Sequence, residues 1–167
     1  MILIYTGNGK GKTSAAVGQA VRASGSGLRV AFGQFLKRPG QAGEQKLLAQ
    51  LLGQDFLAAG KGFFRSARER HKHRQAAVEL LQWAREKIPD HDLVVLDESI
   101  YALQSGLITT EELQSILDLA AGQGVHLVLT GRNTPDWLAE KADTVSEITE
   151  IKHHFQTGLN AVRGIEY

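Results

Sequence analysis

The sequence predicts an α/β fold in which a largely parallel sheet is flanked by helices. Apolar runs of strand length alternate with helix-like segments along the chain, which is typical of parallel strands joined by crossover helices. The run from Leu93 to Leu96 contains no polar residue, as expected for a strand that is covered on both faces. With 167 residues, 43% of them hydrophobic, the chain has the size and composition of a single domain over residues 1–167.

The expected strands are residues 2–5, 28–35, 93–96 and 126–130, with 93–96 at the centre of the sheet. The expected helices are residues 13–24, 44–52, 67–87, 110–121 and 135–141. In the third helix, a spacing of three and four residues predicts one buried stripe, made of Ala77, Leu80, Leu81, Ala84 and Ile88. Thr109 and Glu112 resemble a capping box at the start of the fourth helix, and Pro135 suits the first turn of the fifth.

Composition excludes several classes of function. The chain has no cysteine, which removes thiolate catalysis, iron–sulfur clusters and cysteine zinc sites and fits a reducing compartment. Its net charge of +1 argues against a dedicated nucleic-acid binder. No stretch approaches the roughly 20 apolar residues of a membrane span, and the short first run does not resemble a signal peptide. We therefore expect a cytoplasmic protein with no nucleic-acid or membrane partner.

A glycine-rich loop follows the first strand and leads into an alanine-rich helix. Its residues are Gly7, Asn8, Gly9, Lys10, Gly11, Lys12 and Thr13. Glycines allow backbone N–H groups to converge on an anion, and a helix N-terminus adds unpaired donors and partial positive charge. We expect Lys12 to be an exposed cation and Thr13 to offer a hydroxyl to Mg²⁺. A flexible turn that binds nothing is the weaker interpretation of so many glycines and lysines after a strand.

The spacing of this loop departs from the usual G-x-x-x-x-G-K-[ST] pattern. Counting back from Gly11 places Thr6 where the first glycine belongs, and counting from Gly7 leaves the loop one residue short. The sequence therefore predicts a phosphate-binding loop of altered shape.

Two carboxylates, Asp97 and Glu98, follow the buried run 93–96. Ligands of open α/β sheets bind at the carboxyl ends of the strands, where a carboxylate can hold Mg²⁺ opposite Thr13. The structural alternative is that Asp97 caps the N-terminus of the next helix. The phosphate-binding loop favours the metal role.

Taken together, these motifs are similar to the ATP:corrinoid adenosyltransferases of the cobalamin pathway. The matching stretches span the chain, and they are residues 6–13, 22–23, 34–37, 60–63, 94–98, 129–132, 142–147 and 151–153. The resemblance implies a P-loop, RecA-like nucleotide-binding fold. It also implies transfer of the 5′-deoxyadenosyl group of ATP to a Co(I) corrinoid, with release of inorganic triphosphate.

Site roles follow from the resemblance residue by residue. Residues Gly7 to Thr13 would bind the triphosphate and ribose, with Asn8 on the ribose side and Lys12 as a catalytic cation. Arg22 would neutralise phosphate charge, and Thr13 and Glu98 would hold Mg²⁺. Phe63 would press on the lower face of the corrin and help to remove the lower cobalt ligand, although Arg65 stands where some relatives carry a second aromatic residue.

The resemblance also implies an electron donor protein or a flavin reductant for the corrinoid, and a homodimer. Some relatives have an N-terminal extension over the active site, which we expect this chain to lack. Two other functions remain open from the residues alone, an ATP-hydrolysing P-loop enzyme and a nucleotide-dependent carrier of corrinoid. Arg132 either faces the site or pairs with a carboxylate. The basic run at residues 65–74 is either a solvated face or a contact for corrin, phosphate or a partner.

Overall fold

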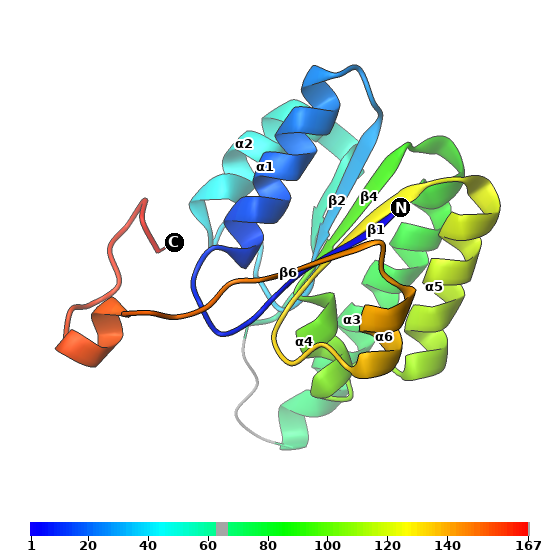
Figure 1. Ribbon diagram of the computed structural model, residues 1–167. Coiled ribbons are helices and arrows are strands. Elements are labelled where there is room, and N and C mark those ends of the chain that lie inside the picture. Colours follow the sequence, from blue (N-terminus) through cyan, green and yellow to red (C-terminus); the bar gives the residue numbers. More distant parts are fainter. Residues whose placement is uncertain (63–66, 167) are drawn as a thin grey trace.

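The computed structural model describes residues 1–62 and 67–166, and its centre is one six-stranded, all-parallel sheet (Figure 1). The strands lie in the order β3-β2-β4-β5-β1-β6. They are β1 (Ile2–Thr6), β2 (Val30–Gln34), β3 (Phe56–Ala58), β4 (Leu93–Asp97), β5 (His126–Thr130) and β6 (Thr144–Glu147). The predicted parallel α/β sheet is confirmed, and the expected central strand lies inside it, between β2 and β5.

Helices cover both faces of the sheet, and Figure 1 shows α1 and α2 on one face with the others opposite. The helices are α1 (Lys12–Gly25), α2 (Gly43–Leu52), α3 (Ala67–Lys87), α4 (Ser99–Gln104), α5 (Thr110–Gln123) and α6 (Asp136–Lys141). Short 3₁₀ turns η1 (Gly53–Asp55) and η2 (Ile88–Asp90) directly follow α2 and α3, and η3 (His154–Thr157) lies in the C-terminal segment. Every predicted helix is present, with ends that differ by at most two residues.

The core has one part on each face of the sheet. Helix α1 contributes Ala16, Ala20 and Ala23, whose small side chains allow the helix to pack closely on the aromatic and branched residues of β2 and β4. On the other face the predicted stripe of α3 is buried, from Ala77 to Ile88. The size of each of these buried side chains therefore matters for keeping both helical layers packed on the sheet.

Local signals set the ends of several helices. The capping box of α5 is present, because Thr109 accepts a hydrogen bond from the Glu112 N–H and the Glu112 side chain accepts one from the Thr109 N–H. Glu112 also pairs with Arg74 of α3 at 2.5 Å. Arg74, which belongs to the basic run at residues 65–74, therefore links α3 to α5. Pro135 is the N-cap of α6 and not a residue of its first turn.

The carboxyl ends of the strands place polar residues at one edge of the sheet. Thr6, Gln34, Asp97 and Thr130 end β1, β2, β4 and β5, and the loops that follow these strands carry the site described below. The chain after β6 runs past the loop between β1 and α1, toward the side that carries α1 and α2 (Figure 1). Among the described helices, none is long and apolar enough to cross a membrane.

Candidate nucleotide-binding site

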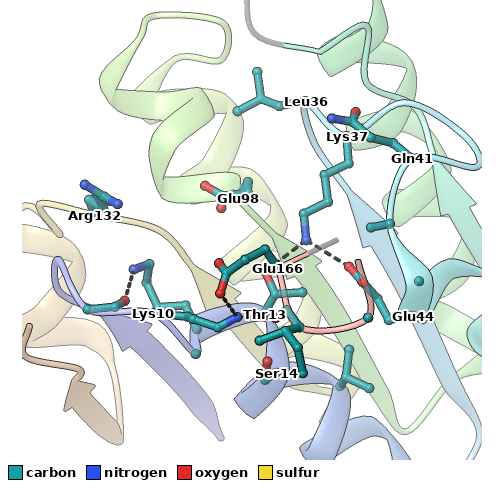
Figure 2. A pocket seen from close by; sticks show the side chains of 18 of the residues that line it. Lys10, Thr13, Ser14, Leu36, Lys37, Gln41, Glu44, Glu98, Arg132 and Glu166 are labelled. Carbon is teal, nitrogen blue, oxygen red and sulfur yellow. Dashed lines mark hydrogen bonds and ion pairs between the residues drawn. The ribbon is translucent and has the colours of Figure 1, made fainter. Parts of the chain in front are cut away.

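A cavity of about 870 Å³ lies at this edge of the sheet, beside the N-terminus of α1 (Figure 2). Its walls come from the glycine loop, the segment between β2 and α2, the ends of β4 and β5, and the C-terminal segment. Its polar side chains include Asn8, Lys10, Thr13, Ser14, Lys37, Gln41, Glu44, Glu98, Arg132 and Glu166. The structure thus brings loop residues 8–13 and Glu98 to one cavity, whereas Gly7 is not among its lining residues.

The glycine loop is held against the segment that follows β6. The Gly9 N–H donates to the Ile148 carbonyl at 2.7 Å, and the Ile148 N–H donates to the Thr6 carbonyl at 2.8 Å. A Cβ atom on Gly7 or Gly9 would lie 2.5 or 2.7 Å from the Ile148 oxygen, too close for any side chain. Gly7 also has a φ of 99°, which favours glycine. These two glycines therefore allow the loop to pack on its neighbour.

Lys12 is buried, and the expectation of an exposed cation is wrong. Its side chain is 8% exposed in the first turn of α1, and its ammonium donates to the carbonyls of Gly7 at 2.7 Å and Gly9 at 2.8 Å. Burial lowers the pKa of Lys12, and the Arg132 charge lowers it further. The loop folds back over the lysine because the loop carbonyls would otherwise lack partners.

Asp97 is the centre of a buried hydrogen-bond network at the end of β4. Its carboxylate is fully buried. Oδ1 accepts from the hydroxyls of Thr130 at 2.7 Å and Thr13 at 3.0 Å, and Oδ2 accepts from the Gln34 amide at 3.1 Å. Lys37 adds its ammonium at 3.1 Å from Oδ2. Asp97 is thus the partner of Thr13, and its interpretation as a helix cap is wrong because the N-cap of α4 is Glu98.

The ammonium of Lys37 lies among three oxygens, and Figure 2 shows it beside Thr13 and Glu44. It is 3.0 Å from Thr13 Oγ1, 3.0 Å from Glu44 Oε1 and 3.1 Å from Asp97 Oδ2. Burial lowers the pKa of Lys37, but the carboxylates of Asp97 and Glu44 outweigh it, so the pKa of Lys37 is raised. Burial raises the pKa of Glu44, yet Lys37 outweighs that effect and the pKa of Glu44 is lowered. Lys37 and Glu44 are therefore both charged at neutral pH.

Glu98 lines the cavity next to this network. Its backbone is left-handed, with a φ of 61°, and its N–H donates to the Thr130 hydroxyl at 2.8 Å. Burial raises the pKa of Glu98, and the Asp97 carboxylate raises it further. Within residues 1–62 and 67–166, the other non-glycine residues with positive φ are Leu36 and Asn133, which follow β2 and β5. Backbone strain is thus concentrated at the cavity edge of the sheet, as is common at functional sites.

The structure does not bring every expected residue to the cavity. Arg22 is exposed in the last turn of α1, and ten residues of helix place it about 15 Å along the axis from Lys12. It therefore makes no contact with the loop of its own chain. Phe63 and Arg65 lie outside the described residues. Arg132, for which two roles were open, lines the cavity.

Several lining residues were not predicted from the sequence. Lys37 lies in the matching stretch 34–37 and follows the carboxyl end of β2, where a ligand contact is common, but no role was expected for it; Glu44 carries no motif. Glu166 forms an ion pair with Lys10 at 3.0 Å, and Lys10 also donates to the Ile165 carbonyl. No pattern in the local sequence indicates that the C-terminal segment reaches the glycine loop.

A strand that leads through a glycine loop into a helix, at the ligand edge of a parallel sheet, defines a P-loop nucleotide-binding protein. The family described as ATP:corrinoid adenosyltransferase BtuR/CobO/CobP matches residues 1–167. The chain belongs to this family.

Curated relatives agree with this assignment. The chain is 37% identical over 169 residues to the corrinoid adenosyltransferase of Escherichia coli K12, covering 100% of this chain and 85% of that protein. The corrinoid adenosyltransferase CobA of Salmonella typhimurium gives the same values. The corrinoid adenosyltransferase of Pseudomonas aeruginosa is 35% identical over 172 residues, covering 100% of this chain and 83% of that protein. Among solved structures, a DNA replication initiation factor matches with a TM-score of 0.48 and 17% identity, over 88% of this chain and 39% of that one.

Proposed function

We propose that the cavity beside α1 is the ATP site of this corrinoid adenosyltransferase. Family membership makes the chain an enzyme that adenosylates a corrinoid with ATP. The observation that supports the location is the glycine loop at the N-terminus of α1, which faces the cavity with Lys10 and Arg132 nearby. Backbone N–H groups, a helix N-terminus and two cations suit a triphosphate.

The reaction needs no nucleophile from the protein. The Co(I) lone pair of the corrinoid attacks C5′ of ATP, the cobalt–carbon bond forms, and the C5′–oxygen bond breaks with its electron pair leaving on the triphosphate. The protein's contribution is to align the two substrates and neutralise the charge on the leaving group. We assign the triphosphate and ribose to residues 7–13, with Asn8 toward the ribose and Lys12 fixing the loop that holds the phosphates.

We propose that Thr13 and Glu98 hold Mg²⁺ at this site. The donors fit the ion, because Thr13, Glu98 and Glu44 offer oxygen atoms to the cavity and Asp97 accepts the Thr13 hydrogen, which leaves hydroxyl lone pairs for a cation. The ammonium of Lys37, seated at 3.0 Å from Thr13 Oγ1, shows that a positive charge is stabilised there. Bound Mg²⁺ supplies charge neutralisation for the leaving triphosphate.

The residues that contact the corrin are proposed from the resemblance of the sequence to the adenosyltransferase family. We propose that Phe63 presses on the lower face of the corrin, and its neighbour Gly62 supports this by lining the cavity. We assign Arg22 no phosphate contact within its own chain. An electron donor protein or a flavin reductant would supply Co(I).

The assembly and setting of the enzyme are also proposals. We propose that residues 1–167 form one domain, supported by a single sheet with helices on both faces. We propose a homodimer, supported by exposed apolar side chains in the C-terminal segment, namely Ile151, Phe155, Leu159, Val162 and Ile165. A cytoplasmic location fits the absence of cysteine from the sequence.

The decisive experiment supplies chemically reduced Co(I) corrinoid and MgATP without oxygen. We expect the visible spectrum of a cobalt–alkyl product together with one inorganic triphosphate per product. A reaction without enzyme is the control. ADP and phosphate without a cobalt–alkyl product would instead indicate a hydrolase, and binding of both substrates without any turnover would indicate a carrier.

A further inference from the structure

Oxygen atoms surround the Lys37 ammonium in the way that they surround a bound cation. Thr13 Oγ1, Glu44 Oε1 and Asp97 Oδ2 lie at 3.0, 3.0 and 3.1 Å from Nζ. They come from three different elements, α1, α2 and β4. Two of these oxygens belong to carboxylates, so the position carries negative charge that a cation must balance.

The backbone around Lys37 is fixed in a way that directs it to this position. Leu36, just before it, is left-handed with a φ of 62°, a conformation that is unfavourable for a non-glycine residue. The Gly62 N–H donates to the Leu36 carbonyl at 2.6 Å, and the Gly60 N–H donates to the Lys37 carbonyl at 3.0 Å. A Cβ on Gly60 would lie 1.9 Å from the Leu36 carbonyl carbon. The left-handed backbone of Leu36 and the close packing of Gly60 thus fix the position from which the Lys37 side chain extends.

The contact with Thr13 creates a conflict with a metal ion. The Thr13 hydroxyl gives its hydrogen to Asp97 and accepts a hydrogen from Lys37, so the ammonium covers a lone pair of the oxygen assigned to Mg²⁺. Two cations on one oxygen would be within about 5 Å of each other and would repel strongly. A divalent cation and Lys37 therefore compete for Thr13.

We infer that Lys37 is an internal cation that a divalent metal ion displaces from Thr13 and Asp97 when it binds. This inference rests on the proposed function, because it takes Thr13 as a metal ligand. Glu44 retains the displaced ammonium, since its carboxylate lies in the cavity wall and is also fixed by the Gln34 amide at 3.1 Å. The buried Asp97 carboxylate is then never without a neighbouring positive charge, and the positive charge of Lys37 remains beside the triphosphate.

The first test measures Mn²⁺ binding in the absence of nucleotide, from the electron paramagnetic resonance signal of free Mn²⁺. Lys37→Met keeps the length of the side chain and removes its charge, and we expect it to bind Mn²⁺ about tenfold more tightly than the parent, or better. Lys46→Met is the matched control, because Lys46 is an exposed lysine of α2 and we expect no change. Equal or weaker Mn²⁺ binding by a folded Lys37→Met variant would overturn the inference.

A second variant tests whether the tighter Mn²⁺ binding of Lys37→Met depends on the Thr13 hydroxyl. Thr13→Val removes the hydroxyl at nearly constant shape, and in the Lys37→Met background we expect it to abolish the tighter Mn²⁺ binding. Retention of that binding would show that removal of Lys37 acts only through general charge. In the parent, Thr13→Val should weaken Mn²⁺ binding in the presence of ATP, and failure of that result would refute the proposed metal site itself.

Lysine labelling tests the inference in the unmodified chain, in case Lys37→Met does not fold. Reductive methylation followed by mass spectrometry reports how accessible each ammonium is. We expect saturating MgCl₂ to raise the labelling of Lys37 severalfold relative to Lys46, because the displaced ammonium loses two of its three partners. Unchanged relative labelling with bound metal would contradict displacement.

Discussion

Lys12 illustrates how one side chain supports the loop as well as the anion that the loop binds. Its ammonium bridges the carbonyls of Gly7 and Gly9, on the inner side of the loop. Those contacts turn the N–H groups of the same peptides toward the cavity, because the carbonyl and the N–H of a peptide unit point in opposite directions. The lysine thereby organises the anion site even before ATP binds.

Lys12→Ala tests this dual role. We expect ATP affinity to fall by about 1.5–3 kcal/mol, the usual contribution of a charge-assisted hydrogen bond. We also expect a lower free energy of unfolding, because two buried carbonyls lose their donor. Calorimetric ATP titration and urea denaturation measure the two effects. A variant with full stability and full ATP affinity would show that the ammonium does neither.

Glu98 is the carboxyl group whose charge opposes folding. Its pKa is raised by burial and by Asp97, so the folded state holds the proton more tightly than the unfolded state does. Below the unfolded-state pKa of about 4.3 there is no penalty, and stability is lost as the pH rises through the folded-state pKa. Ionisation of Glu98 therefore comes at the expense of stability.

Glu98→Gln should consequently separate stability from activity. We expect the variant to be more stable than the parent at neutral pH, with the difference shrinking toward about pH 4. Adenosylation should fall, and more Mg²⁺ should be needed to sustain it. Urea denaturation across pH and a Mg²⁺ titration of the reaction measure these effects. A stability difference that does not change with pH, or an unaltered Mg²⁺ titration, would indicate a purely structural residue.

At the residue scale, the sequence identified groups that lie close together in the chain. The glycine loop, Thr13 and the pair after β4 could be recognised because strand, loop and helix follow one another directly. Lys37 could not, because its contact with Asp97 depends on β2 lying beside β4 in the sheet. Glu44 could not either, because it joins this network through Lys37 and Gln34. The burial of Lys12 was missed for a related reason, since it depends on how the loop closes.

Among the elements, the short edge strand β6 has the clearest effect on the site. It pairs with β1, and its continuation, residues 147–149, lies against the glycine loop. A Cβ on Gly9 would lie 2.7 Å from the Ile148 carbonyl oxygen, which is backbone and cannot rotate away. The matching stretch at residues 142–147 therefore has a structural role in supporting the phosphate-binding loop.

Gly9→Ala tests this support. We expect ATP binding to be lost, because the loop must move off the segment after β6, while helix content stays unchanged. Gly18→Ala is the matched control. Gly18 lies within α1, no atom lies within 4 Å of an added Cβ, and alanine should stabilise the helix by about 1 kcal/mol. ATP titration and circular dichroism measure both variants, and normal ATP affinity in Gly9→Ala would contradict the role of the contact.

The elements that the sequence did not predict are the short ones. Strand β3 has three residues, and β6 has four exposed ones, so neither shows a periodic apolar pattern. Helix α4 has six residues and begins directly after Glu98, without a side-chain cap. The long helices were predicted because a repeated apolar stripe or a capping box marked them. Packing on neighbouring strands, and not local preference, holds the short elements.

For the whole molecule, the sheet order determines where the cavity lies. Helices after β1 and β2 cover one face, and those after β3, β4 and β5 cover the other. Between β1 and β5, the connections therefore leave toward opposite faces and open a crevice at the strand ends. The glycine loop and Arg132 lie on the two sides of this crevice, as expected for a ligand site of an open parallel sheet.

The two ends of the sequence also meet at this site. Glu166 pairs with Lys10, which lowers the pKa of Glu166 and ties the C-terminal segment to the phosphate-binding loop. We expect Glu166→Gln to bind ATP more tightly, because Lys10 becomes available to the phosphates. The gain should shrink at high salt, which screens exposed charges. Titration at two salt concentrations measures it, with Glu140→Gln on the exposed face of α6 as control, and weaker ATP binding would show that Glu166 assists the nucleotide.

The position of β1 also matters while the chain is being synthesised. Strand β1 leaves the ribosome before β5 and β6, yet it lies between them, pairing Ile2 with Leu127 and Leu3 with Thr144. Until those residues emerge, β1 has no neighbour and the phosphate-binding loop has no support. The strands that can pair early are β2 and β3, whose separation in the chain is short. The nascent enzyme is therefore unable to use ATP as a folding ligand until β5 and β6 have been translated.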